Sequence, residues 1–162
     1  MGWTTCYHWN TPTDIKREIL ADYAKSEHVE VLDHKSTCYG KHWWVALRNK
    51  KTGTSFICLF KMERFQQDDC WGYKDIDEAM GPNETDCPIS LLDRTTEPTE
   101  GFAVDWRACV RKAAERRSQK FEVGDKVLCH GREYKVTGKR GRSYILDYRW
   151  KAGAAKLHPV SA

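Results

Sequence analysis

The feature that most constrains the fold is a pair of apolar β-type runs within residues 41–60, KHWWVALRNKKTGTSFICLF. The polar segment 49–53 between the runs ends in glycine and is typical of a tight turn, so the pattern predicts a β-hairpin. Strand side chains alternate between two faces. One face of the first strand receives Trp43, Val45 and Leu47, and the other receives Trp44 and Ala46. Because residues 56–60 are apolar without interruption, we expect the second strand to be central and covered on both faces.

The chain before the hairpin predicts a short strand within residues 1–9, then a helix, then a strand at 28–37. Thr11 suits the N-cap of that helix, because Pro12 follows at the first helical position and Asp14 stands in the first turn. One helical face is apolar and consists of Ile15, Ile19, Leu20, Tyr23 and Ala24. We expect this face to pack on the sheet.

A second helix is predicted for residues 102–118, followed by a change of pattern. Its apolar stripe comprises Phe102, Trp106, Val110 and Ala113 or Ala114, with most cations on other faces. From Phe121 onward, short alternating runs are separated by glycine turns, a pattern typical of a small SH3-like barrel. The sequence therefore predicts an α+β fold: an antiparallel sheet with helices in residues 1–118, and a small all-β SH3-like barrel in residues 119–162.

Composition excludes a disordered chain and a membrane span. Of the 162 residues 40% are hydrophobic, with 7 Trp, 7 Tyr and 5 Phe, and no apolar run approaches the roughly 18 residues that a span needs. The first residues, MGWTTCYHWN, lack the basic lead and apolar stretch of a signal peptide. The 7 cysteines occur without any C-x-x-C spacing, so we expect reduced thiols in a cytoplasm, that of a bacterial host.

The net charge of +4 conceals a segregated layout. Residues 1–62 sum to +3, residues 63–105 to −9 and residues 106–162 to +10. Such asymmetry indicates either an intramolecular contact between acidic and basic segments or a tail that faces a polyanion.

The acidic stretch GYKDIDEAMGPNETDCP, residues 72–88, is the first candidate site. Asp75, Asp77 and Glu78 lack the spacing of a calcium loop, although one or two carboxylates suffice for magnesium. We favour carboxylates that cap turns after the sheet and face the basic helix. Asp86 or Cys87 is expected to cap a short helix that starts near Pro88.

Cys87 raises the alternative of a catalytic thiol. A helix N-terminus stabilises a thiolate, and a nearby histidine would serve as its base. An inert packing role is the simpler interpretation. Phosphate-binding glycine loops and the common hydrolase motifs are absent from the sequence, so we expect no cofactor and no metal.

The strongest candidate site is the cationic C-terminal part. Its predicted nucleic-acid-binding residues are Arg107, Arg111, Lys112, Arg116, Arg117, Lys139, Arg140, Arg142, Tyr144, Tyr148 and Trp150. The cations would neutralise phosphates, and the aromatic rings would provide stacking surfaces for bases.

Three stretches resemble a known family: the start MGWT, the block GYKDIDEAMGPNETDCP and the later DWRACVRK. Together they are similar to an uncharacterised domain family encoded mainly by bacteriophages and plasmids, and the resemblance covers roughly residues 1–117. It implies a mobile-element origin rather than an activity. The tail FEVGDKVLCHGREYKVTGKRGRSYILDYRW is similar to SH3-like barrels of the KOW and Tudor kinds, which bind nucleic acid, ribosomal partners and peptides alike.

These observations leave three functional hypotheses. The first is a non-enzymatic binding protein of phage or mobile-element origin that engages nucleic acid or a host nucleic-acid-bound complex. The second is a protein inhibitor of a host defence, such as a CRISPR or restriction system. The third is an enzyme that acts on nucleotides or nucleic acid through Cys87 or through Asp75, Asp77 and Glu78.

Overall fold

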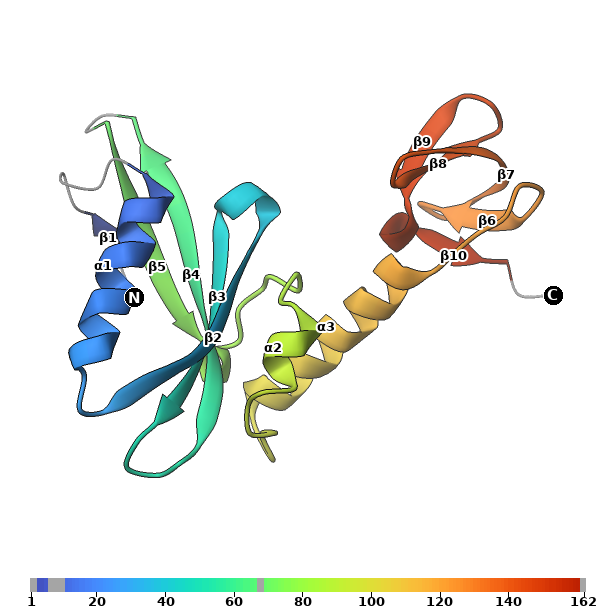
Figure 1. Ribbon diagram of the computed structural model, residues 1–162. Helices are drawn as coiled ribbons and strands as arrows, with labels where there is room; N and C mark the ends of the chain where they lie inside the picture. The colour runs from blue at the N-terminus through green and yellow to red at the C-terminus, as the bar shows by residue number, and fades with distance from the viewer. Residues whose placement is uncertain (1–2, 6–10, 67–68, 161–162) are drawn as a thin grey trace. The chain divides into compact units, whose positions relative to one another are not determined.

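The computed structural model describes residues 3–5, 11–66 and 69–160, and the chain divides into two compact units, 1–110 and 111–162 (Figure 1). Each unit contains one five-stranded antiparallel sheet, which confirms the mixed α/β composition expected from the sequence. Only two residues of the expected strand in 1–9 are described as strand, and residues 1–2 and 6–10 lie outside the described chain.

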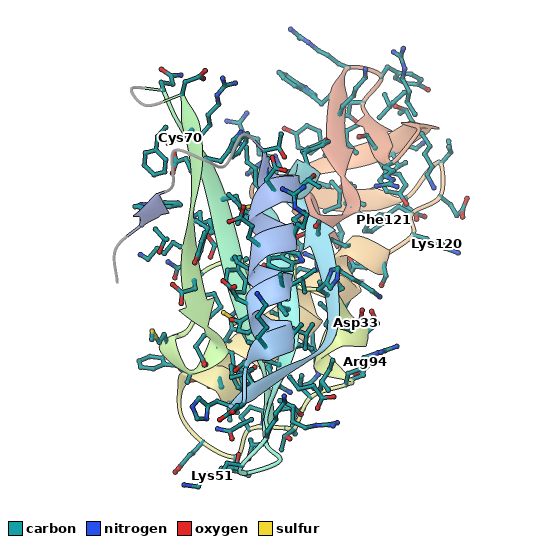
Figure 2. All side chains as sticks on the ribbon, turned by 60° about the vertical axis from the view of Figure 1, so that its left-hand side comes forward. Asp33, Lys51, Cys70, Arg94, Lys120 and Phe121 are labelled. Carbon is teal, nitrogen blue, oxygen red and sulfur yellow. The ribbon has the colours of Figure 1, made fainter. Side chains whose placement is uncertain are left out.

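The N-terminal unit orders its strands β1-β5-β4-β3-β2. Its elements are β1 (Thr4–Thr5), α1 (Pro12–Lys25), β2 (Val29–Thr37), η1 (Cys38–Gly40), β3 (His42–Asn49), β4 (Ser55–Phe65), β5 (Cys70–Asp77), η2 (Glu78–Met80), α2 (Ile89–Leu92) and the first half of α3 (Phe102–Ser118). The predicted hairpin is β3–β4, which pairs Arg48 with Ser55 next to the turn. Asn49 Oδ1 accepts the backbone N–H of Lys51 at 2.9 Å, and Lys51 itself lies at the tip of the hairpin (Figure 2).

Both faces of this sheet are covered, as the hairpin predicted, and helices provide the cover on each side. On the first face α1 packs over a core of Ile15, Ile19, Trp43, Val45, Leu47, Cys58, Phe60 and Met62. On the second face α2 and the start of α3 pack over Trp44, Ala46, Ile57, Leu59, Cys87, Leu91, Leu92, Trp106 and Val110. Figure 1 shows α1 on one side of the sheet and α2 with α3 on the other. Alternate side chains along β3 therefore belong to two separate cores, one on each face of the sheet.

The start of α1 is confirmed. Thr11 is the N-cap and its hydroxyl accepts the backbone N–H of Asp14 at 3.2 Å. Pro12 occupies the first turn, where its missing N–H costs nothing. Ile15 and Ile19 are the buried residues of the helix, while Ala24, expected on the same face, is exposed.

The expectation that the acidic stretch follows the sheet is wrong. Residues Cys70–Asp77 form β5, which pairs with β4 over eight residues, so the stretch begins inside the sheet. Trp71 and Tyr73 pack on the α1 side and Ile76 packs on the opposite side. The carboxylates of this strand obscured its apolar alternation in the sequence.

The cap expected for the short helix is also different. α2 begins after Pro88, which makes no side-chain cap, while Asp86 and Cys87 are used elsewhere. Arg94, just beyond α2, lies 3.5 Å from a carboxylate oxygen of Asp33 on β2, a proximity that can be followed in Figure 2. Burial of Leu91 and Leu92 rather than capping therefore holds this four-residue helix.

The C-terminal unit has the strand order β10-β6-β7-β8-β9. Its elements after α3 are β6 (Lys126–Cys129), β7 (Arg132–Arg140), β8 (Ser143–Leu146), β9 (Trp150–Gly153), η3 (Ala154–Lys156) and β10 (Leu157–Pro159). The core consists of Val127, Cys129, Val136, Tyr144, Leu146, Ala152 and Leu157. Within the described chain no helix is long and apolar enough to cross a membrane.

The boundary between the two units falls after Val110, inside α3. The helix has the predicted bounds, Phe102–Ser118, and its buried residues are Ala103, Trp106, Arg107 and Val110. All four lie in the first half, so only that half shares the core of the N-terminal unit.

Truncation of the α1 face provides a test of the first core. Ile15→Ala removes a fully buried side chain, so we expect a loss of about 2–5 kcal/mol in the free energy of unfolding. Urea unfolding followed by tryptophan fluorescence reports this unit, since 6 of the 7 tryptophans precede residue 111. The control Thr13→Ala, exposed on the same helix, should change the stability by less than about 0.5 kcal/mol. Equal effects of the two variants would contradict this packing.

Candidate functional site

The candidate site lies on the inner face of the C-terminal sheet, where that face is left uncovered. Arg132 and Tyr134 share the inward face of β7 with buried Val136, and Trp150 shares the inward face of β9 with buried Ala152. Inward positions of a small sheet are normally filled by apolar core residues. Here Arg132 is exposed, and Trp150 retains 54% of its accessible surface.

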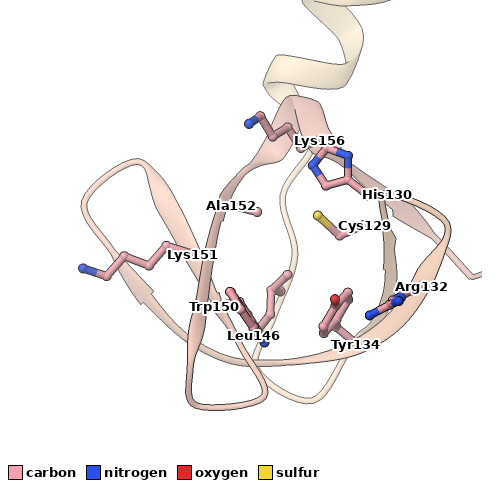
Figure 3. Close-up of a pocket in the computed structure, with 9 residues that line it drawn as sticks. All are labelled: Cys129, His130, Arg132, Tyr134, Leu146, Trp150, Lys151, Ala152 and Lys156. Carbon is pink, nitrogen blue, oxygen red and sulfur yellow. The ribbon is translucent and has the colours of Figure 1, made fainter.

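These inward residues line a pocket of about 330 Å³ (Figure 3). The lining residues are Cys129, His130, Arg132, Tyr134, Leu146, Trp150, Lys151, Ala152 and Lys156. Cys129, Leu146 and Ala152 are buried and belong to the core, so they form an apolar floor. The volume stands at the lower end of the range for small-ligand sites.

The rim of the pocket is electropositive. Arg132, Lys151 and Lys156 contribute three cations from three different elements, and no carboxylate belongs to the lining. The described part of the chain supplies no ion-pair partner for any of these three side chains. A site of this kind favours an anionic group, because cations beside a low-dielectric wall strengthen the local field.

Trp150 is held at the mouth of the pocket by its neighbours. The Arg149 guanidinium lies 5.2 Å from the centroid of the Trp150 ring, in a cation–π contact. The preceding loop is fixed although Asp147 and Tyr148 have positive φ angles of 46° and 60°. Asp147 Oδ1 accepts the Lys135 N–H at 2.9 Å, and the Tyr148 N–H donates to a threonine hydroxyl on β7 at 2.8 Å. These bonds offset the strain of the left-handed backbone.

A tight turn positions the other side of the rim. Cys129 and Arg132 pair across a two-residue connection, in which His130 and Gly131 have φ angles of 51° and 77°. Positive φ at both positions is the geometry of a type I′ hairpin. The turn therefore places His130 and Arg132 at the same end of the β6–β7 ribbon.

Two of the predicted nucleic-acid-binding residues are not at the surface, and these predictions are wrong. Arg107 has no exposed surface and belongs to the N-terminal unit. Tyr144 is 3% exposed, packs edge-on against Phe121 with 5.4 Å between ring centroids, and its hydroxyl accepts the Phe121 N–H at 3.2 Å. The Lys139 Nζ lies 5.4 Å from the centroid of the Tyr144 ring, in a cation–π contact. Tyr144 is a core residue rather than a stacking surface.

The remaining predicted residues belong to the C-terminal unit. Lys139, Arg140 and Arg142 are exposed around the β7–β8 turn, and Tyr148 is 87% exposed. Lys112 and Arg116 lie on the second half of α3, together with Arg111 and Arg117, which are engaged in intramolecular contacts. Of all the predicted residues, Trp150 alone lines the pocket.

Sequence reasoning missed the other rim residues, Arg132, Tyr134, Lys151 and Lys156. A signal was present for two of them. The alternation of Arg132, Tyr134 and Val136 places a cation on the inward face of a strand, which a purely structural sheet does not require. Lys151 and Lys156 carry no comparable signal, because their proximity depends on how β9 and η3 meet.

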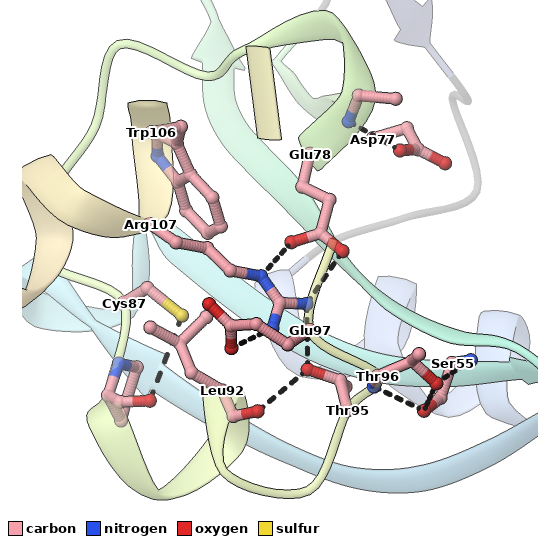
Figure 4. Close-up of polar contacts among 12 residues, drawn as sticks. Ser55, Asp77, Glu78, Cys87, Leu92, Thr95, Thr96, Glu97, Trp106 and Arg107 are labelled. Atoms are coloured by element: carbon pink, nitrogen blue, oxygen red, sulfur yellow. Dashed lines mark hydrogen bonds and ion pairs between the residues drawn. The ribbon is translucent and has the colours of Figure 1, made fainter. Parts of the chain in front are cut away.

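The acidic stretch serves structure in the N-terminal unit (Figure 4). Arg107 Nε and Nη2 donate to the two carboxylate oxygens of Glu78 at 2.7 and 2.8 Å, and Glu78 is only 4% exposed. Arg107 Nη2 also donates to the Thr95 hydroxyl at 2.9 Å, and Nη1 donates to Glu97 at 3.3 Å. Asp77 accepts the N–H of Ala79 and caps η2. The expected contact between acidic stretch and basic helix thus exists, through Arg107.

Two further carboxylates of the stretch are paired with cationic or titratable side chains on β3 and β4. His42 Nδ1 lies 2.8 Å from Asp86 Oδ2. Lys61 Nζ donates to Glu84 Oε1 at 2.6 Å. Burial is the largest single influence and would raise the pKa of Glu84, but the hydrogen bond from Lys61, a backbone hydrogen bond and the nearby charges of Lys61 and His42 together outweigh it, so the pKa is lowered. Lys61 correspondingly has a raised pKa, mainly because of this hydrogen bond.

The catalytic alternatives receive no geometric support. Cys87 has no exposed surface, and its Sγ lies 3.8 Å from the carbonyl oxygen of Pro88. The Glu78 carboxylate is engaged in a buried ion pair with Arg107. Within the described residues no group of three or more His, Cys, Asp or Glu side chains is arranged to hold a metal ion.

Comparisons with known proteins add no family. No protein-family model matches the chain, and no curated protein or solved structure matches it. Two stretches of the sequence, residues 72–88 and residues 105–112, contact each other directly in the structure. Glu78 of the first stretch binds Arg107 of the second, and Trp106 Nε1 donates to the Glu84 carbonyl at 2.9 Å. The two stretches are therefore partners in one packed layer.

Removal of one member of the buried ion pair should be severe. Glu78→Leu leaves the Arg107 charge buried without its main partner, so we expect a loss of about 3–5 kcal/mol in the free energy of unfolding. Glu97→Ala, at a carboxylate that is 59% exposed, should cost less than about 1 kcal/mol. The double variant Glu78→Leu with Arg107→Met should regain most of the loss, because no charge then remains buried. If Glu78→Leu lowers the free energy of unfolding in urea by less than about 1 kcal/mol, the stabilising role of the buried Arg107–Glu78 ion pair is refuted.

Thiol reactivity separates a buried Cys87 from a catalytic one. In a Cys6→Ser background, since Cys6 lies outside the described residues, Ellman's reagent should label Cys38 and Cys109 rapidly, as both are exposed. Cys58, Cys70, Cys87 and Cys129 are buried and should react only after unfolding. Mass spectrometry of the labelled peptides assigns the sites. Labelling of Cys87 in the native protein as fast as that of Cys38 would revive the catalytic hypothesis.

Proposed function

We propose that this is a non-enzymatic binding protein of phage or mobile-element origin that engages nucleic acid through its C-terminal unit. The observation that carries the proposal is the pocket rim, which presents Arg132, Lys151 and Lys156 beside the exposed ring of Trp150 without a carboxylate. Cations for phosphates and an aromatic surface for bases are the two components of nucleic-acid sites that do not read sequence.

The distribution of charge between the units supports the proposal. Residues 111–162 contain 14 Lys and Arg against 5 Asp and Glu, while residues 1–110 contain 13 against 18. Much of the acidic complement of the C-terminal unit is occupied locally. Glu133 pairs with Lys126 at 3.1 Å, and Asp125 and Asp147 accept backbone N–H groups. The excess positive charge is therefore directed to solvent, where it attracts a polyanion.

The topology supports an SH3-like barrel for residues 119–162. The strand order β10-β6-β7-β8-β9 brings the last strand beside the first, with the short 3₁₀ helix η3 directly before the last strand. This connectivity is what an SH3-like barrel requires. The architecture leaves the ligand open, since such barrels serve several classes of partner, so the proposal depends on the chemistry of the rim.

A protein partner is the second candidate, and one observation favours it. Phe102 and Met80 of the N-terminal unit are 71% and 56% exposed. Both lie beside Gly81: Met80 precedes it in the chain, and a Cβ built on Gly81 would lie 3.4 Å from the Cβ of Phe102. Exposed apolar side chains gathered in one place are typical of protein contacts. A host-defence inhibitor would use such a surface. The titration that follows distinguishes the two candidates.

Binding of a labelled 20-nucleotide single strand, followed by fluorescence anisotropy between 25 and 200 mM salt, tests the proposal. We expect affinity to fall steeply with salt, and we expect Arg132→Ala and Lys151→Ala each to reduce the slope of log K against log salt by about 0.7, the loss of one phosphate contact. Lys25→Ala and Lys51→Ala remove exposed cations from the N-terminal unit and should change nothing. Absence of binding at 25 mM salt, or equal losses in the controls, would exclude this function in favour of the protein partner.

A further inference from the structure

The pocket is concave, and this shape restricts the kind of nucleic acid that it accepts. Double-stranded DNA is read by convex elements, such as a helix or a β-ribbon, that enter a groove about 12 Å wide. The candidate site is instead a hollow of about 330 Å³ with a buried apolar floor of Cys129, Leu146 and Ala152. A base stacked inside a duplex enters such a hollow only after it is unpaired and unstacked, which costs a few kcal/mol. An unpaired base that leaves its neighbours enters it directly.

The walls of the pocket are suited to a planar guest. Trp150 on β9 and Tyr134 on β7 face the opening from two sides (Figure 3). Trp150 is 54% exposed, although the alternation of side chains along β9 places it on the inward face of the sheet. An aromatic ring on an inward-facing position that the core does not cover gains its missing contacts when a flat ligand stacks on it.

A second observation concerns the polar groups at the walls. The structure gives the half-buried Tyr134 hydroxyl no hydrogen-bond partner among the described residues. A hydroxyl both donates and accepts, so it suits the mixed donor and acceptor edge of a base. The Tyr134 hydroxyl is therefore available to a ligand in the pocket.

The cations stand where the two phosphates beside a captured base would pass. Arg132 of β7 and Lys151 of β9 come from opposite sides of the opening, with Lys156 of η3 at a third side, and the Lys151 side chain extends outward from the pocket (Figure 3). A strand that dips one base into the pocket enters and leaves across this rim. Both flanking phosphates then meet a cation, which fixes the backbone while the walls hold the base.

We propose that the pocket captures one unpaired base of a single-stranded nucleic acid between Trp150 and Tyr134, so that the protein selects single strands over duplexes. This inference rests on the proposed nucleic-acid-binding function and deepens it by naming the form of the ligand. The floor and walls recognise the base, and the rim recognises the phosphates.

Three probes of one length test it: a 12-nucleotide single strand, the duplex of the same sequence, and a single strand whose central three positions are abasic. We expect the single strand to bind at least tenfold more tightly than the duplex, measured by anisotropy at fixed low salt. The abasic strand keeps its phosphates but loses stacking, so it should bind about 5- to 150-fold more weakly than the intact strand.

Protein variants connect this selectivity to the pocket. Trp150→Leu should weaken the intact strand by a similar factor and leave the abasic strand unchanged, because the two losses remove the same contact. Tyr148→Leu is the matched control, since Tyr148 is 87% exposed two residues away and does not line the pocket. It should bind all probes as the unchanged protein does. Circular dichroism of each variant confirms that the fold is retained.

The outcomes separate the inference from the function on which it rests. Failure of every probe to bind removes both. Salt-dependent binding in which duplex, abasic and intact strands are equivalent, or in which Trp150→Leu and Tyr148→Leu behave alike, retains the cationic binding function and overturns base capture. Loss of intact-strand affinity in Trp150→Leu alone, with abasic affinity unchanged, supports base capture.

Discussion

The buried ion pair between Arg107 and Glu78 is the interaction on which the N-terminal unit depends. All three guanidinium nitrogens of Arg107 meet acceptors, on Glu78, Thr95 and Glu97. Removal of a charge from water costs several kcal/mol per ion, and only this complete set of bonds offsets it. The 3₁₀ helix after β5, the loop after α2 and the first half of α3 are consequently held in one arrangement. That arrangement lays Trp106 over Trp44, with 5.7 Å between ring centroids, and closes the second core of the sheet.

The C-terminal unit shows the opposite use of polar residues. Arg107 is a cation that the fold has consumed, whereas Arg132 and Lys151 are cations that the fold leaves without partners among the described residues. Trp150, on an inward position, is left more than half exposed. Departures from a consistent inward and outward pattern tend to mark functional positions, because a purely structural sheet gains nothing from them. The contrast supports the proposal that the small sheet carries the binding site, while the polar contacts of the large one serve stability.

Particular residues show how far the sequence reached. The uninterrupted apolar run of residues 56–60 predicted a central strand covered on both faces, and adjacent Trp43 and Trp44 on the paired strand are indeed buried on opposite sides. The same reasoning failed for β5, where Asp75 and Asp77 interrupt the apolar pattern. Arg107 was misplaced because neighbouring cations on a helix look alike in sequence, and the burial of one depends on a carboxylate 29 residues away. The charge of the sequence indicated the unit that contains the candidate pocket, but the residues that line the pocket depend on how the strands of the sheet meet.

The amino-acid sequence by itself determined the covered hairpin, the start of α1, the bounds of α3 and the concentration of positive charge after residue 110. These features are local, since they follow from alternation, capping and composition. Tertiary structure alone decided that Arg107 is buried, that Tyr144 belongs to a core and that Arg132, Lys151 and Lys156 surround one hollow. Each of these facts depends on which distant segment lies opposite a side chain, and the chain settles that only when its sheets and helices pack.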